Sequence, residues 1–130
     1  MWLNANRQGQ IAGANMAGDD QTFDANVLVN LAHYLEYDFI SMGDVSSCRP
    51  EDEVYEYEDE RYYIRAVKGT DGAFKCINII GSADSNGIAK NIFIKSFENK
   101  DAELDIRTIC FLQDRKFPDS FIKFMGGKYR

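Results

Sequence analysis

Large apolar residues recur at helical spacing in the first third of the chain. Those between residues 24 and 39 fall in one stripe at about 100° per residue, and they are Leu28, Leu31, Ala32, Leu35 and Phe39. Thr22 or Asp24 can accept hydrogen bonds from the first free N–H groups of such a helix, and Gly43 can end it. The pattern predicts one amphipathic helix over residues 24–39, with Asn26, Asn30, His33 and Tyr37 on its polar side.

After Pro50 the chain consists of short segments rich in Val, Ile, Phe and Tyr. Turn residues separate these segments at intervals of about 10 to 15 residues, which is typical of strands. We expect strands near residues 53–67, 73–80, 88–98, 104–113 and 120–125. The connections are too short for crossover helices, so neighbouring strands should pair antiparallel.

These elements predict an α+β fold in which the helix packs on a curved antiparallel sheet of four to five strands. Residues 1–22 are rich in Asn, Gln, Gly and Ala, and we expect them to be irregular. In element order alone, this arrangement resembles cystatin-like and NTF2-like folds. One helix covers only one face of a sheet, so a remaining apolar face must curl inward, receive residues 1–22 or be buried in a dimer.

The length of 130 residues corresponds to a single domain, in which residues 53–125 form an antiparallel meander. The net charge of −6 argues against nucleic acid as a partner, because phosphate binding draws its affinity from clustered Lys and Arg. The apolar runs are far shorter than the 18 or so residues needed to cross a bilayer, so no membrane association is expected. Cys48, Cys76 and Cys110 form no C-x-x-C pair, which indicates reduced thiols and a cytoplasmic protein.

The acidic run over residues 51–60 is the most unusual stretch, since seven of its ten residues are Asp or Glu. Four of the seven tyrosines lie in this run or directly after it. In an extended strand Tyr55 and Tyr57 share one face, and the glutamates between and after them share the other. The predicted binding residues are Tyr55, Glu56, Tyr57, Glu58, Tyr62 and Tyr63, together with His33 and Tyr37 from the polar side of the helix.

Two interpretations of this run are open. An exposed aromatic strip backed by carboxylates can bind a basic peptide or an organic cation through cation–π and ionic contacts. Alternatively, the run is an edge strand whose charges prevent aggregation while its tyrosines pack on the core. Basic residues dominate the chain from Arg115 to Arg130, and this segment could dock on the acidic run or simply be solvated.

The residues that carry enzyme chemistry are sparse. His33 is the only histidine, which excludes sites that need two imidazoles, and no cofactor or metal is expected. Cys48 lies in a loop but precedes an acidic run that disfavours its thiolate. A curved sheet could bury a pair of carboxylates, such as Asp105 with Glu103 or Asp38, to act as acid and base. Gly126-Gly127-Lys128 lacks the rest of a phosphate loop. An enzyme is therefore the less favoured class.

The favoured hypothesis is a non-enzymatic binding protein that presents an acidic, tyrosine-rich surface to a protein partner, as an inhibitor, immunity or adaptor protein does, or to a second copy of itself. The alternative is a pocket for a small organic ligand between the helix and a curled sheet, used for binding or for lyase- or isomerase-like chemistry. We expect such a pocket to be lined by Phe74, Ile94, Phe97, Ile109 or Phe111. Mimicry of nucleic-acid charge is a third and lesser possibility.

Overall fold

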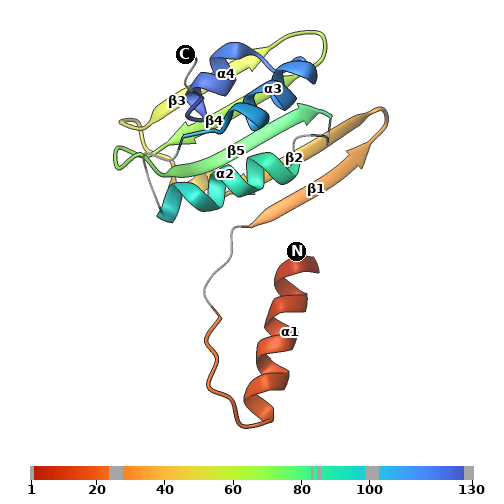
Figure 1. Cartoon of the computed structure of the whole chain (residues 1–130), viewed down its shortest axis with the longest axis vertical. Coiled ribbons are helices and arrows are strands. Elements are labelled where there is room, and N and C mark those ends of the chain that lie inside the picture. The colour runs from red at the N-terminus through yellow and green to blue at the C-terminus, as the bar shows by residue number, and fades with distance from the viewer. Residues whose placement is uncertain (1, 24–27, 83, 85, 99–102, 128–130) are drawn as a thin grey trace.

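The computed structural model describes residues 2–23, 28–82, 84, 86–98 and 103–127 (Figure 1). Its elements are α1 (Trp2–Met16), β1 (Val29–Tyr34), β2 (Tyr37–Gly43), a short 3-10 helix η1 (Val45–Ser47), β3 (Glu53–Glu58), β4 (Tyr63–Lys68), β5 (Phe74–Gly81), α2 (Asn86–Glu98), α3 (Ile106–Asp114) and α4 (Asp119–Phe124). This is an α+β fold with an N-terminal helix and a five-stranded antiparallel sheet, which confirms the predicted fold class.

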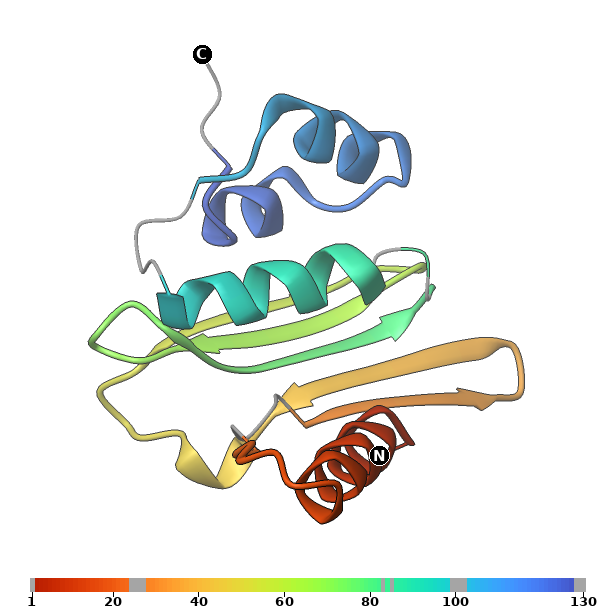
Figure 2. The same ribbon diagram turned by 60° about the horizontal axis from the view of Figure 1, so that its bottom comes forward.

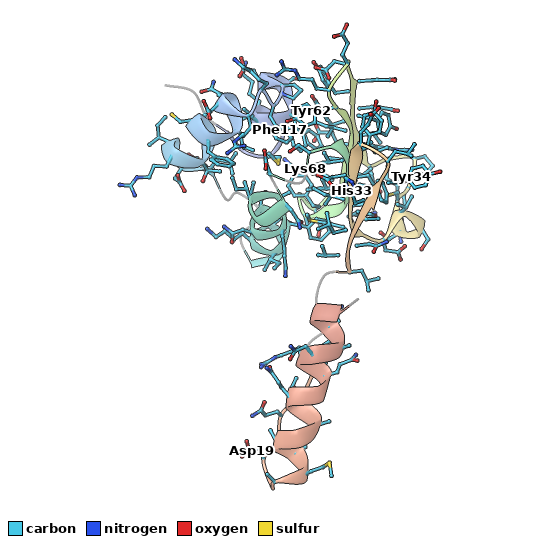
Figure 3. All side chains as sticks on the ribbon, turned by 90° about the vertical axis from the view of Figure 1, so that its right-hand side faces the viewer. Asp19, His33, Tyr34, Tyr62, Lys68 and Phe117 are labelled. Atoms are coloured by element: carbon cyan, nitrogen blue, oxygen red, sulfur yellow. The ribbon has the colours of Figure 1, made fainter. Side chains whose placement is uncertain are left out.

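The sheet is open, and its strand order is β1-β2-β5-β4-β3. Every neighbouring pair is antiparallel, with β5 in the centre and β1 and β3 at the two edges. Helices α2, α3 and α4 form a layer on one face, as Figure 2 shows. In Figures 1 and 3, α1 extends beyond the end of the sheet.

The core lies between this helical layer and the three inner strands. Ile40 of β2, Ile79 of β5 and Ile64 of β4 are neighbours in one cross-strand row, and all three are fully buried. The helices contribute the rest of the core, chiefly Ala89, Phe93, Ile109, Leu112, Phe121 and Ile122. Because α4 has only six residues, its packing rather than its length keeps it helical.

Lys68 is the charged residue that joins β4 to the end of α4. Its Nζ donates a hydrogen bond to the Phe124 carbonyl and lies 4.8 and 4.6 Å from the ring centres of Phe74 and Phe124. Burial lowers the pKa of Lys68 below its ordinary value. The carbonyl at the end of a helix carries partial negative charge, so the ammonium group helps to hold α4 on the sheet.

Residues 29–43 form a hairpin of β1 and β2. The helix predicted over residues 24–39 is therefore wrong over residues 29–39, and residues 24–27 lie outside the described residues. Leu35, with a φ of 55°, lies in the turn between the two strands. Pairing with β5, almost forty residues later, buries Ile40 and Met42 completely. The free energy gained by this long-range burial outweighs the local preference of the helical stripe, although Leu28, Leu31 and Leu35 of that stripe remain exposed in the hairpin.

The segments predicted as strands near residues 88–98, 104–113 and 120–125 are instead helices α2, α3 and α4. Short apolar runs have the same appearance in a buried strand and in a buried helix, which explains the error. The Asp105 carboxylate caps α3 by accepting the Thr108 N–H at 2.9 Å, so its role is structural. Residues 2–16, predicted as irregular, form α1.

The remaining strand predictions hold in part. Residues 53–67 form two strands, β3 and β4, because Asp59 accepts hydrogen bonds from the N–H groups of Arg61 and Tyr62 and so closes a turn between them. Strand β5 matches the prediction for residues 73–80 to within one residue. Three helices follow β5, whereas the cystatin-like or NTF2-like order expected from the sequence has only strands there. Over the described part of the chain, none of the helices has the length and apolar character needed to cross a bilayer.

Candidate functional site

The face of the sheet opposite α2, α3 and α4 is not covered by these helices (Figure 2). Cross-strand pairing puts Phe39, Ile80 and Tyr63 in one row across its three inner strands. A second row contains Ser41, Asn78 and Arg65. We call the surface formed by these six residues, with Glu56 and Glu58 at its β3 side, the open face.

The open face combines apolar and charged groups. Ile80 is 36% exposed, and Phe39 and Tyr63 are half-buried, so the first row is accessible from solvent. Glu58 pairs with Tyr63 and Glu56 pairs with Arg65 across β3 and β4. Both glutamates are exposed. An apolar row with a carboxylate border resembles in composition the core and rim of a protein interface.

Tyr63 connects the apolar row to the acidic border. Its hydroxyl donates a hydrogen bond of 2.9 Å to Oε1 of Glu56. The hydrogen bond with the Glu56 carboxylate raises the pKa of Tyr63. The hydroxyl group therefore lies at the acidic border, which suits a contact residue with an apolar body and a polar tip.

Tyr55 and Tyr57 of β3 lie on the helical side of the sheet. Tyr55 packs 5.5 and 5.3 Å from the ring centres of Phe121 and Phe124, and its hydroxyl is 2.8 Å from Oγ of Ser120. Tyr57 is half-buried on the same face and donates a hydrogen bond to Asp59. The expected alternation of Tyr and Glu is confirmed, but the fully exposed Tyr55–Tyr57 strip is not observed.

Tyr62 is a core residue, as Figure 3 shows beside Phe117. The two rings stack with their centres 4.5 Å apart, and the Tyr62 hydroxyl donates to the Arg115 carbonyl at 2.9 Å. Burial raises the pKa of Tyr62. Arg115 forms its ion pair with Asp84 at 2.6 Å rather than with the acidic run, so this part of the basic segment does not dock there.

His33 and Tyr37 lie on the β1–β2 hairpin, at the opposite side of the sheet from the acidic run. Nδ1 of the exposed His33 is 2.8 Å from Oδ1 of Asp38, its neighbour across the hairpin. Tyr37 is 47% exposed and shares the face of Phe39. The structure therefore separates these two residues from Glu56, Glu58 and Tyr63, although Tyr37 extends the open face.

The loop over residues 44–52 covers the end of the sheet where Cys76 and Val67 are buried. Asp52 fixes this loop, because its buried carboxylate is 2.7 Å from Nζ of Lys75 and accepts the Arg49 N–H at 2.6 Å. The hydrogen bond from Lys75 lowers the pKa of Asp52. Thus Asp52, like Asp59 in the turn between β3 and β4, is a structural member of the acidic run, and only its tertiary contact with Lys75 reveals this.

Cys48, which belongs to this loop, meets Cys76, with their sulfur atoms 3.7 Å apart in a thiol–thiol contact and no disulfide between them. Burial, together with the contact to Cys48, raises the pKa of the Cys76 thiol to about 12. Much less of the reactive thiolate is therefore present at neutral pH than for an ordinary cysteine. Cys110 is exposed and Cys48 is partly exposed.

We therefore expect a thiol reagent such as dithionitrobenzoate to react rapidly with Cys110, more slowly with Cys48 and slowest with Cys76 in the folded protein. The release of thionitrobenzoate measures these rates, and single Cys→Ser variants assign them. In denaturant all three thiols should react alike. Equal rates in the native protein would show that Cys76 is not shielded.

The residues expected to line a small-molecule pocket differ in their surroundings. Phe74 and Ile109 are packed in the core, whereas Phe111 is 37% exposed on α3; the side chain of Phe97 is outside the description. A separate, open depression of about 500 Å³ lies against α3 and α4 and is lined by Gln113, Asp119, Lys123 and Gly127. Among the described residues, no three His, Cys, Asp or Glu side chains come together as metal ligands.

The geometry defines the class of this chain as a two-layer α+β protein whose antiparallel sheet carries helices on one face and is accessible on the other. Comparison of the chain with protein-family models and with curated proteins finds no match. The signal for the open face was present in the sequence as the alternation of Phe39 and Ser41 with Ile40 and Met42, but it was hidden by the overlapping helical stripe.

Proposed function

We propose that this protein is a non-enzymatic binding module whose open face docks on a protein partner. The observation that carries this proposal is the accessible row of Phe39, Ile80 and Tyr63 beside exposed Glu56 and Glu58. A contiguous apolar row on an accessible sheet costs solvation free energy unless a second surface covers it. Tyr63 adds a rigid ring that loses little conformational entropy on binding.

The charges on the open face indicate the chemistry of the partner. Glu56 and Glu58 lie at one border of the apolar row, and the chain as a whole carries a net charge of −6. A partner with an apolar centre flanked by Lys or Arg is complementary to this surface and is steered toward it. The same charge disfavours nucleic acid. We place this interaction in the cytoplasm, where reduced thiols such as Cys48 and Cys76 persist.

The test compares capture of partners from a lysate of the native host by the wild-type protein and by two variants with the same substitution. Ile80→Asp puts a charge in the centre of the open face, whereas Ile106→Asp changes an exposed residue on α3. We expect that Ile80→Asp lowers the recovery of the partner at least about tenfold, because the substitution buries a charge at the contact. Ile106→Asp should leave the recovery of the same partner unchanged.

Glu56→Lys with Glu58→Lys is the second arm of the experiment. If the partner has a basic rim, the double variant should associate with it more slowly, and the association rate should lose its dependence on salt concentration. Circular dichroism checks that every variant is folded. Partners that bind wild type, Ile80→Asp and the double variant equally well would show that the open face is not the binding surface.

A further inference from the structure

The two edges of the sheet differ sharply in their protection against pairing with another strand. The β3 edge carries Glu53, Glu56 and Glu58, and such charges are a common device against association of sheet edges. Strand β1 has the sequence Val-Asn-Leu-Ala-His-Tyr and contains no Asp, Glu, Lys, Arg or Pro. It is the edge on which addition of a strand is least opposed.

The backbone of β1 presents hydrogen-bonding groups along its outer side. The Gly43 N–H donates to the Leu28 carbonyl at 2.9 Å, so the backbone groups of Leu28 point toward β2. Alternation along a strand then turns those of Asn30, Ala32 and Tyr34 toward β2 as well. The N–H and C=O groups of Leu31 and His33 consequently point to the outer edge.

The side chains on this edge are apolar and exposed. Leu28, Leu31 and Tyr34 are 60%, 52% and 75% exposed. Figures 1 and 2 show β1 at the outer margin of the sheet, away from α3 and α4. Large apolar groups beside an unprotected backbone edge are the features that strand addition uses.

We propose that β1 pairs antiparallel with β1 of a second copy of this chain, which joins the two sheets into one of ten strands. With Leu31 on the two-fold axis, its outward N–H donates to the C=O of Leu31 in the second copy, and its own C=O accepts the N–H of that residue. The two Leu31 side chains meet on the helical face. In this register Leu28 meets Tyr34 of the second copy on the other face. Each exposed apolar group of the edge thus finds an apolar partner.

Charge determines which edge of the sheet a second copy can use. The chain carries a net charge of −6, so two copies repel each other over most approaches. Pairing of two β1 edges brings no carboxylates of the paired strands together, because β1 contains no Asp or Glu. Pairing of two β3 edges would place Glu side chains of one copy against those of the other. An isologous, antiparallel pairing also closes after two copies and does not continue into a fibre.

The mass of the protein in solution, measured by analytical ultracentrifugation over a range of concentrations, tests the proposal. The wild type should form a reversible dimer. Leu31→Lys adds a charge to the proposed contact and should weaken dimerisation at least tenfold. Val54→Lys is the matched control, because Val54 is 51% exposed on the other edge strand, and its dimerisation constant should equal that of the wild type.

Hydrogen exchange of the wild-type amides provides a readout that needs no variant. The Leu31 amide should exchange slowly in the dimer and become fast on dilution, while the Ala32 amide, which faces β2, stays slow at both concentrations. A protein that remains monomeric at all concentrations would overturn the proposal. So would a dimer that Val54→Lys or Ile80→Asp weakens as much as Leu31→Lys, since its contact would then lie at β3 or on the open face.

Discussion

Phe121→Ala is expected to lower the free energy of unfolding by about 3 to 5 kcal/mol, the range typical of a large aromatic side chain removed from a core. Phe121 is fully buried on α4, with its ring centre 5.5 Å from that of Tyr55 and 6.1 Å from that of Phe117. Its removal takes away one of the aromatic contacts that join α4 to β3 and leaves the contact between Tyr55 and Phe124. A six-residue helix cannot persist without such packing, so the cavity would be accompanied by loosening of α4.

Urea unfolding followed by circular dichroism measures the change, and Phe111→Ala is the matched control. Phe111 is 37% exposed on α3 and stacks only on the guanidinium of Arg115, at 5.2 Å. Replacement of Phe111 by Ala should lower the free energy of unfolding by about 1 kcal/mol. If the two variants lost the same stability, Phe121 would not occupy the centre of the helical layer.

Gly43→Ala should also be strongly destabilising, by about 2 to 5 kcal/mol, because it combines a strained backbone with a steric clash. Gly43 ends β2 with a φ of +78°, a conformation that side chains disfavour. A Cβ at this position would lie 2.1 Å from the Lys75 carbonyl oxygen and 2.6 Å from Cζ of Phe93. That carbonyl accepts the Asp44 N–H at 3.1 Å and cannot withdraw without disturbing β5.

The control for this prediction is Gly87→Ala, in the first turn of α2, where a Cβ would meet no atom within 4 Å. Alanine is the better helix former, so this variant should be as stable as the wild type or up to about 1 kcal/mol more stable. Thermal and urea unfolding of both variants give the comparison. A neutral effect of Gly43→Ala would mean that β2 does not enter the loop over residues 44–52 as described.

Several features of the fold were predictable from local pattern. The alternation of Tyr and Glu over residues 53–58 correctly placed Tyr55 and Tyr57 on one face and Glu56 and Glu58 on the other, because successive side chains of a strand point in opposite directions. The end of the strand predicted at residue 67 and the start of the next at residue 73 likewise agree with β4 and β5 to within one residue, because Asp71 and Gly72 between them are typical turn residues. These predictions succeeded because they depend on neighbours in sequence.

The candidate site was only partly predictable. Glu56, Glu58 and Tyr63 belong to the open face, but Tyr55, Tyr57 and Tyr62 pack on the helical side. Whether a tyrosine in an edge strand faces solvent or the core depends on which face the helices cover. The helices that decide this come after β5 in the chain, and their apolar runs were mistaken for strands.

The sequence by itself determined the α+β class, the antiparallel sheet, the position of β5 and the alternation of faces over residues 53–58, because composition and two-residue alternation are local properties. The tertiary structure alone decided that residues 29–43 form a hairpin, that α2, α3 and α4 cover one face, and that Asp52 is a structural ion-pair partner of Lys75. Helical and strand propensities differ by only a few tenths of a kcal/mol per residue, whereas complete burial of Ile40 or Met42 against β5 contributes about 1.5 to 3 kcal/mol each. Contacts between distant segments therefore overruled the local pattern wherever the two disagreed.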